Sequence, residues 1–513
     1  MKHEIVRQAL IYACEEMGAL LRRSSFSPNI REREDFSCAI YDADGELIAQ
    51  AEHIPVHLGS MRWAVRAVLD EFKPSEMEPG DAFLLNDPYS GGTHLPDLTI
   101  VAPAFHDDEL MAFAVVRAHH ADVGGKVPGS MPHDAEDVYS EGLRIPPIKV
   151  AEDGETRDDV LRLLEANSRG GEERRYDLTA QIAAAFRGCR QVRRIIDEHG
   201  CEAWERACEW CKDYAERRMR VVIERVPDGE YTGEDYLEGD GISEDPVRIS
   251  VTVLVEGDEV TVDFTGTDEQ TRGPVNAPLP VTYSAVFFAL KAALDPETPV
   301  SEGTYRPIEV IAPRGTVVNP EPPAPVCAGN VETSQRIVDA ILDALREAIS
   351  NLPAHSHGSM NNVVIGGVGF AYYETVGGGA GASPDGDGES AVHVYMTNTA
   401  STPVEHVERE YPIRILEHTV RRGSGGEGKY RGGDGIVKRY LALERCRVTV
   451  IGDRTMHPPR GVDGGKPGKT SEYEVERSNG EVERLGPKDS TVLEPGDMLV
   501  VRTAGGGGYG SGE

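Results

Sequence analysis

The sequence lacks any run of about 18 apolar residues, so we expect no segment that spans a membrane. Its first 25 residues, MKHEIVRQALIYACEEMGALLRRSS, place charges among the apolar positions and contain no small-residue cleavage site. These features disfavour a secretory signal peptide and favour an amphipathic opening helix over residues 4–22. The cytoplasm is therefore the expected location.

Lysine is scarce: of 53 basic residues in the 513-residue chain only eleven are Lys, and they stand against 87 acidic residues. The formal net charge is −34, and the acidic residues are dispersed rather than gathered in a tail. A dispersed negative excess keeps a protein soluble and argues against binding to nucleic acid or anionic lipid. Because salt screens such repulsion, the balance also fits a salt-rich cytoplasm, and we treat a halophilic origin as a hypothesis.

Cysteines are few, and eight in a chain of this length are too sparse for a disulfide scaffold. Cys208 and Cys211 form a CxxC inside a helix-like stretch, but no second CxxC completes a zinc site. We expect buried free thiols there. Cys38 lies in a strand pattern, which favours packing over a nucleophilic role.

Nucleotide-binding loops and common hydrolase motifs are missing as well. The stretch GVDGGKPGKTSEY, residues 461–473, imitates a P-loop but has Asp463 where the motif needs glycine. Residues 376–388 contain a loose GxGxxA that is followed by turn signals instead of a helix. No GxSxG elbow or HExxH helix occurs. We therefore expect that the chain does not bind ATP through either loop.

The elements that the sequence does contain predict an α+β fold with more than one sheet. Helical periodicity predicts helices over residues 61–72, 177–199, 201–226, 281–293 and 333–350. Strand patterns cover residues 81–87, 111–119 and 248–267, and Asp-Ala-Asp-Gly marks a hairpin within residues 35–57.

This order divides the chain into four predicted regions. They are an N-terminal α/β region with a candidate metal site (1–157), a helical segment (158–225), a mixed α/β region (226–354) and a Gly-rich, β-dominated C-terminal region (355–513). The helical segment is our expected surface for a partner or for self-association.

Metal-capable side chains gather in NDPYSGGTHLPDLT, residues 86–99, and in RAHHAD, residues 117–122. His94 and Asp97 are three residues apart in a turn, and His119 and His120 end an apolar strand. Since neighbouring strand residues point to opposite faces, only one of these two histidines should face a given site. Two imidazole nitrogens and one carboxylate oxygen suit Zn²⁺, Mn²⁺ or Fe²⁺.

Further residues could join this site, and a plainer interpretation exists. Asp87 or Asp122 could add another oxygen ligand. Asp-Pro and Pro-Asp pairs also form turns without any metal, and a buried His bonded to Asp is common. His53 and His57 in EHIPVHLGSM could support the site, take part in catalysis or be structural. The local pattern leaves these alternatives open.

Several stretches, in order and along nearly the whole chain, resemble the B subunit of hydantoinases. The N-terminal ones are EREDFSCAIYDADGELIAQAEHIPVHLGSM, GDAFLLNDPYSGGTHLPDLTIVAP, RAHHADVGGKVPGSMP and EGLRIPPIKV. The later ones are DFTGTDEQTRGPVNAP, NVETSQRI, NTASTPVEHVEREYP and SGGEGKYRGGDG. The family includes N-methylhydantoinase B subunits, the C-terminal half of 5-oxoprolinase and the alpha subunits of acetone and acetophenone carboxylases.

The resemblance implies a division of labour between two chains. A hydantoinase A-type partner binds ATP and phosphorylates the substrate, and the B-type chain completes the hydrolysis or carboxylation. In the carboxylase branch a His-x-x-Asp and a downstream His hold a divalent metal, which here are His94, Asp97 and His119. Asp87 remains a weaker fourth candidate, since its alignment is insecure.

We therefore expect the B-type chain of an ATP-dependent hydrolase of a small cyclic amide, a hydantoin or 5-oxoproline, in a hetero-oligomer. His120, Asp122 or His57 would move the proton. The motifs do not separate this interpretation from a carboxylase alpha-type chain or from a non-catalytic scaffold. Ser401 stands where the pattern NTxNTPxE has asparagine, a difference in a possible substrate loop.

The charge balance predicts salt-dependent stability. The Debye length falls from about 30 Å at 0.01 M salt to about 3 Å at 1 M, so dilute buffer restores the repulsion among 87 carboxylates. We expect the free energy of unfolding, measured by urea titration, to fall as KCl is diluted. A protein that stays folded and active in dilute buffer would refute the halophilic hypothesis.

Overall fold

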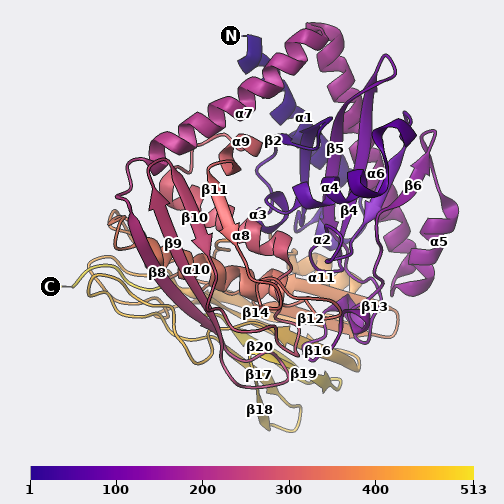
Figure 1. Ribbon diagram of the computed structural model, residues 1–513. Helices are drawn as coiled ribbons and strands as arrows, with labels where there is room; N and C mark the ends of the chain where they lie inside the picture. Colours follow the sequence, from indigo (N-terminus) through magenta and orange to yellow (C-terminus); the bar gives the residue numbers. More distant parts are fainter. Residues whose placement is uncertain (1, 513) are drawn as a thin grey trace.

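A seven-stranded antiparallel sheet forms the N-terminal part of the computed structural model, which describes residues 2–512 (Figure 1). Its strands lie in the order β2-β1-β5-β4-β3-β6-β7. Their bounds are Phe36–Asp42 (β1), Leu47–Gln50 (β2), Ala82–Leu85 (β3), Asp97–His106 (β4), Glu109–His119 (β5), Ile148–Glu152 (β6) and Glu155–Thr156 (β7). The predicted strands 81–87 and 111–119 and the hairpin β1-β2 are confirmed.

Both faces of this sheet are buried, which explains why β5 reads as a continuous apolar run. Phe113 and Val115 of β5 belong to one hydrophobic core. Ala114, Val116 and Ala118 belong to another core on the opposite face. The alternation assigns every residue of β5, including the two histidines at its end, to one core or the other.

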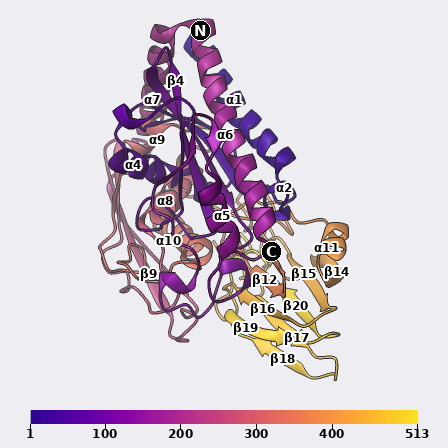
Figure 2. The same cartoon turned by 90° about the vertical axis from the view of Figure 1, so that its right-hand side faces the viewer.

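Helices cover the face that carries Ala114. They are α1 (Lys2–Ser24), α5 (Asp158–Asn167), α6 (Gly171–His199) and α7 (Cys201–Ile223). In Figure 2 the long helix α6 runs along this face, and it contacts β4, β5 and α1. Gly200 separates α6 from α7 with φ at 85°, a left-handed conformation that favours glycine. The helices predicted over 4–22, 177–199 and 201–226 are confirmed.

The other face packs against a second layer of helices and a smaller sheet. The helices are α3 (Pro55–Leu58), α4 (Met61–Glu71), α8 (Leu279–Leu294), α9 (Glu302–Tyr305) and α10 (Ser334–Leu345). The sheet has the order β11-β10-β9-β8, built from Gly229–Leu237 (β8), Val247–Glu256 (β9), Glu259–Asp263 (β10) and Ile308–Ile311 (β11). A π-turn, η4 (Gly329–Thr333), leads into α10. Short 3₁₀ turns are Pro74–Glu76, Pro128–Ser130 and Val138–Ser140.

Two antiparallel sheets enclose a third core in the C-terminal region. The first has the order β13-β12-β16-β19, from Asn362–Gly367 (β12), Phe370–Thr375 (β13), Cys446–Ile451 (β16) and Lys488–Leu493 (β19). The second has the order β14-β15-β20-β17-β18, from Ile413–Arg421 (β14), Gly435–Ala442 (β15), Glu472–Glu476 (β17), Val482–Leu485 (β18) and Met498–Arg502 (β20). The short helix α11 (Val404–Glu410) precedes β14.

Glycine-rich loops of this region pack backbone against backbone. A Cβ atom at Gly506 would collide with the carbonyl of Ala380, and one at Gly432 would collide with the carbonyl of Gly506. The stretch 461–473 belongs to this packing, since Gly465 lies equally close to the carbonyl of Gly508. Strand β17, and not a helix, follows it. The P-loop-like sequence is therefore a structural loop, as expected.

The chain thus has an α+β fold with several separate sheets. The boundaries of the four predicted regions stay a prediction. Within residues 2–512, every helix is too short or too polar to cross a bilayer.

A buried ion pair joins the two C-terminal sheets. Lys438 of β15 lies 2.6 and 2.8 Å from the two carboxylate oxygens of Glu374 on β13, and both side chains are 1% exposed. The hydroxyls of Tyr372 and Tyr440 also donate to Glu374. Burial alone would raise the pKa of Glu374, but Lys438 and the two hydroxyls hold that pKa below its ordinary value.

Replacing Lys438 with methionine should leave the carboxylate of Glu374 buried without a cation. We expect a loss of about 3–5 kcal/mol in the free energy of unfolding, measured by urea denaturation. Lys466→Met is the matched control, because Lys466 pairs with Glu427 in solvent and should change stability by under about 1 kcal/mol. Equal effects of the two substitutions would contradict this account of the ion pair.

Candidate metal centre

The register of β4 with β5 brings the candidate ligands together. Asp97, the first residue of β4, is the cross-strand partner of His119, the last residue of β5. His94 lies in the turn before β4, where its carbonyl accepts a hydrogen bond from the Asp97 amide at 3.1 Å. The Asn86 side chain fixes this turn by donating to the carbonyls of Leu95 and Leu143.

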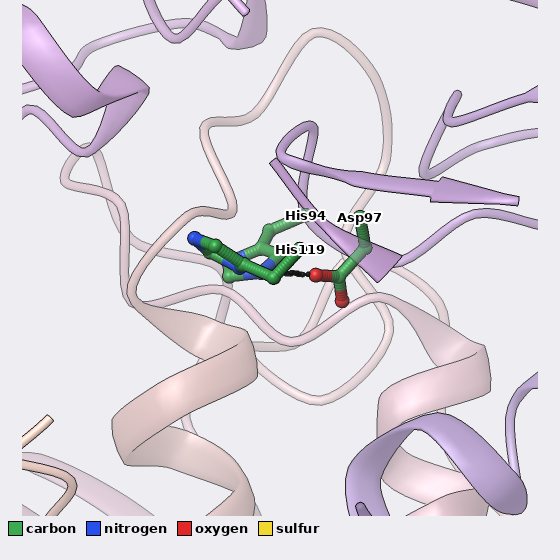
Figure 3. Close-up of side chains that lie close together, drawn as sticks. All are labelled: His94, Asp97 and His119. Atoms are coloured by element: carbon green, nitrogen blue, oxygen red, sulfur yellow. Dashed lines mark hydrogen bonds and ion pairs between the residues drawn. The ribbon is translucent and has the colours of Figure 1, made fainter. Parts of the chain in front are cut away.

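Three side chains converge in this place (Figure 3). Oδ1 of Asp97 lies 3.0 Å from Nε2 of His94 and 3.1 Å from Nδ1 of His119, and the two nitrogens are 3.2 Å apart. Ligands about 2.1 Å from a tetrahedral zinc ion lie about 3.4 Å from one another, so a small inward adjustment separates this set from a coordination shell. All three side chains are 2% exposed or less.

The protonation of the three groups also suits metal binding, which requires deprotonated ligands. Burial lowers the pKa of His119, which favours its neutral form. At Asp97 burial is outweighed by His94 and His57, which hold the pKa well below its ordinary value. At His94 burial opposes the charged ring, but Asp97 raises the pKa, and a divalent cation would replace the bound proton.

Neighbouring groups fix the orientation of the ligands. Nδ1 of His94 lies 3.2 Å from the carbonyl of Cys327, and the backbone at Cys327 donates to the buried carboxylate of Glu141. The ring of Tyr373 stacks on His119 with centroids 4.4 Å apart. Thr93 donates its hydroxyl to Oδ2 of Asp97 at 2.8 Å. Such supporting contacts pre-orient ligands and tune their basicity.

His57 is the one proton-transfer candidate that lies at this cluster. Its Nε2 is 3.4 Å from Oδ2 of Asp97 and 3.9 Å from Oδ1 of Asp35. The hydroxyl of Ser37 lies 3.3 Å from the other ring nitrogen, Nδ1. His53, four residues earlier, faces away and accepts a hydrogen bond from the Cys38 amide.

The other three predicted site residues lie elsewhere. His120 points to the opposite face of β5, where Nε2 lies 3.1 Å from Oε1 of Gln181 on α6. Burial there lowers the pKa of His120 to about 4. Asp122 accepts hydrogen bonds from the Gly124 and Gly129 amides and pairs with Arg169.

Asp87 is likewise occupied by its own turn. It accepts from the Tyr89 amide and pairs with Arg144 at 3.0 Å. The structure therefore does not bring Asp87, Asp122 or His120 to the cluster, because a strand alternates its faces and because turn aspartates bind nearby backbone amides.

Three residues of the site escaped the sequence analysis. Asp35, Asn330 and Tyr373 line a cavity of about 20 Å³ together with His57, His94 and His119. Asp35 precedes β1, whose pairing with β5 sets Phe36 opposite Ala118. That pairing is the only signal that could have identified Asp35, and it is not visible in the sequence. The cavity is large enough for an ion or a water molecule but not for a cyclic amide.

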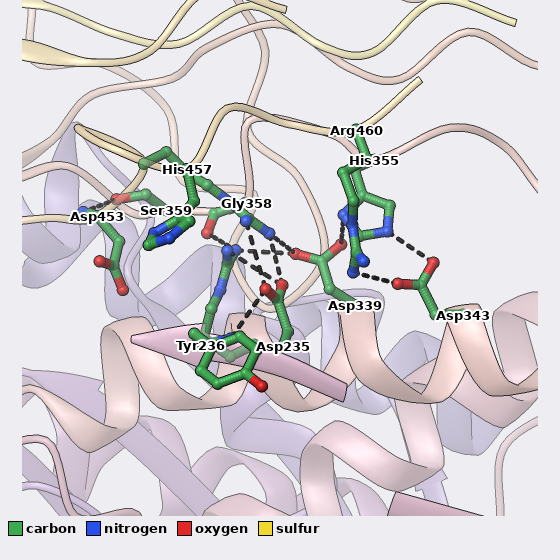
Figure 4. A network of polar contacts seen from close by, with 12 residues as sticks. Asp235, Tyr236, Asp339, Asp343, His355, Gly358, Ser359, Asp453, His457 and Arg460 are labelled. Atoms are coloured by element: carbon green, nitrogen blue, oxygen red, sulfur yellow. Dashed lines mark hydrogen bonds and ion pairs between the residues drawn. The ribbon is translucent and has the colours of Figure 1, made fainter. Parts of the chain in front are cut away.

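A second group of candidate ligands, Asp235, Asp339 and His355, already contacts cations (Figure 4). Nη2 of Arg454 lies 2.6 Å from Asp235 and 2.8 Å from Asp339, and Arg336 lies 2.8 Å from Asp339. Two buried guanidinium groups thus neutralise these carboxylates. We interpret this group as a structural ion-pair network that joins β8, α10 and the loop after β16.

Comparison with known proteins gives a consistent picture. A family model described as hydantoinase B/oxoprolinase matches residues 1–512. The chain is 44% identical to an uncharacterised protein of Methanocaldococcus jannaschii, over 99% of this chain and 90% of that protein. It is 33% identical to the B chain of a D-/L-hydantoinase of a Pseudomonas species, over 99% and 89%. It is 36% identical to the 5-oxoprolinase of Dictyostelium discoideum, over 97% of this chain but only 39% of that protein.

Solved structures share the fold. The ATP-dependent caprolactamase of Pseudomonas jessenii superposes with a TM-score of 0.92 at 30% identity, over 99% of this chain and 90% of that one. A nucleotide-free acetone carboxylase superposes with a TM-score of 0.88 at 18% identity, over 99% and 75%. The second likeness extends to the fold alone.

The geometry predicts that His94→Ala removes a bound metal. We expect one divalent ion per chain in the purified protein by elemental analysis, and an affinity at least about tenfold weaker in the variant, because one of three ligands is lost. His199→Ala, at the end of α6, is the control and should keep the metal. The metal site is refuted if the protein, loaded with Zn²⁺, Mn²⁺ or Fe²⁺ in turn, retains none of them.

Proposed function

Because the chain belongs to the hydantoinase B/oxoprolinase family, we propose that it is the B-type chain of an ATP-dependent amidohydrolase. Its substrate would be a small cyclic amide, a hydantoin or 5-oxoproline, which an A-type partner chain activates by phosphorylation with ATP. The observation that carries the proposal is the buried convergence of His94, Asp97 and His119.

The donor set defines the expected metal. Two imidazoles and one carboxylate, without a thiolate, are typical of catalytic rather than structural sites for Zn²⁺, Mn²⁺ or Fe²⁺. A divalent ion held by these residues would act as a Lewis acid and lower the pKa of water near it. Asp35, whose carboxylate lines the same cavity, could add a further oxygen ligand. These residues would supply the hydrolytic half of the reaction.

His57 is the proposed proton-transfer residue. Its Nε2 lies beside Asp97 and Asp35, so it can take a proton from attacking water and deliver it to the leaving group. Ser37 at Nδ1 and the short helix α3 hold the ring in this orientation. We leave His120 and Asp122 out of the proposed chemistry because both are engaged away from the cluster.

Exclusion of water is the second contribution of this chain. The cavity beside the ligands holds about 20 Å³, and Tyr373 and Asn330 close it. An activated intermediate would therefore be shielded from bulk water once it is bound. Because a cyclic amide does not fit this volume, the segment that carries His57 or the π-turn η4 must move to admit substrate.

Reconstitution with an A-type partner tests the proposal. We expect ring opening that requires ATP, and we expect His57→Asn to lower kcat by about 10²- to 10⁴-fold while the bound metal is retained. Asparagine keeps a polar atom near Nδ1 but removes Nε2. The control is His53→Asn, which keeps an acceptor for the Cys38 amide and should leave kcat unchanged.

Other results would lead to other functions. A product that gains a carboxyl group from labelled bicarbonate would indicate a carboxylase instead of a hydrolase. Full activity of the assembled complex with His94→Ala, together with absence of bound metal, would indicate a non-catalytic scaffold. Either outcome contradicts the proposed hydrolysis.

A further inference from the structure

A second cavity, of about 390 Å³, lies where α2 (Pro28–Arg31), the N-terminus of α6 and α11 meet. Figure 2 shows these three helices on one side of the molecule. None of the residues that line it belongs to the metal centre. Its volume falls in the range of sites that hold small molecules.

The cavity is positively charged in a chain of net charge −34. Its charged lining residues are Arg31, Arg169, Arg174, Arg409, Glu173 and Glu410, and His406 adds an imidazole. Four guanidinium groups thus face two carboxylates. A local reversal of sign against so strong a background attracts anions to this place and repels metal cations.

Arg174 is the central feature of this cavity. Its side chain is 4% exposed, and Nη2 lies 2.9 Å from Glu173. Within residues 2–512, its Nε and Nη1 atoms have no hydrogen-bond partner. The nearest other carboxylate oxygen, Oδ2 of Asp177, is 3.8 Å away. Buried charged donors without acceptors cost free energy, so two donors of Arg174 remain for a ligand in the cavity.

The surrounding groups complete an anion site. Arg169 is held rigidly by Asp122 and by the carbonyls of Gly125 and Val127. Arg31 and Arg409 contact neighbouring carboxylates through Nε and reach into the cavity from solvent. The N-terminus of α6, a helix of 29 residues, adds the positive end of its dipole.

We propose that this cavity binds a small oxyanion, a phosphate or a carboxylate, with Arg174 as the buried anchor. Guanidinium groups bind both oxyanions through paired, charge-assisted hydrogen bonds. Phe370 and Tyr411 form apolar walls, which suit an anion with an organic portion. The site is independent of the proposed hydrolysis, because it uses neither the metal ligands nor His57.

Titration calorimetry with inorganic phosphate and with acetate tests the site in the full-length chain. We expect saturable binding of at least one anion, about tenfold weaker after Arg409→Gln and weaker still after Arg174→Gln. Arg409 is exposed, so its substitution keeps the test valid if Arg174→Gln folds poorly. Arg484→Gln, an equal charge change on an exposed strand residue, should leave the affinity unchanged.

The His94→Ala variant separates this site from the metal centre. Binding that persists in this variant supports the cavity, and preference for phosphate or for acetate identifies the oxyanion. Binding that disappears with His94 would place the anion on the metal and overturn the proposal. Absence of saturable binding, or equal weakening by Arg484→Gln, would overturn it as well. None of these readouts depends on ATP or on a partner chain.

Discussion

The antiparallel register of β4 with β5 is the constraint on which the candidate site depends. It sets Asp97 opposite His119, and the turn before β4 brings His94 to the same point. A shift by one residue would turn His119 toward α6 and present His120 instead. Because both faces of the sheet are packed in separate cores, such a shift would also exchange their apolar residues, so the cores themselves hold the ligands in place.

Burial of charge is the second general feature of this protein. Most buried charged groups are paired, as Glu374 is by Lys438 and as Asp235 and Asp339 are by two arginines. The candidate metal centre is different, since its carboxylate is surrounded by titratable imidazoles instead of permanent cations. Buried ion pairs of the first kind stabilise an arrangement, whereas a carboxylate among imidazoles can exchange a proton for a metal ion.

Much of the fold was predictable because helices and strands leave local periodic patterns. The long helices α1, α6 and α7 and the strands of the first sheet appeared with nearly correct bounds. Strand alternation also predicted that only one of His119 and His120 could face the site, and His119 is that residue. The roles assigned to Asp87 and Asp122 could not be tested by pattern, since an aspartate that ligates a metal and one that closes a turn look alike in sequence.

The sequence by itself determined the types of ligand, the spacing of His94 and Asp97 and the family resemblance, because each depends on residues close together in the chain. Only the tertiary structure decided which side chains meet. Asp35, Asn330 and Tyr373 reach the cavity from three distant segments, and Arg174 meets Arg31 and Arg409 through the packing of α6 with α2 and α11. Such proximity arises from strand pairing and core packing, and no local pattern encodes it.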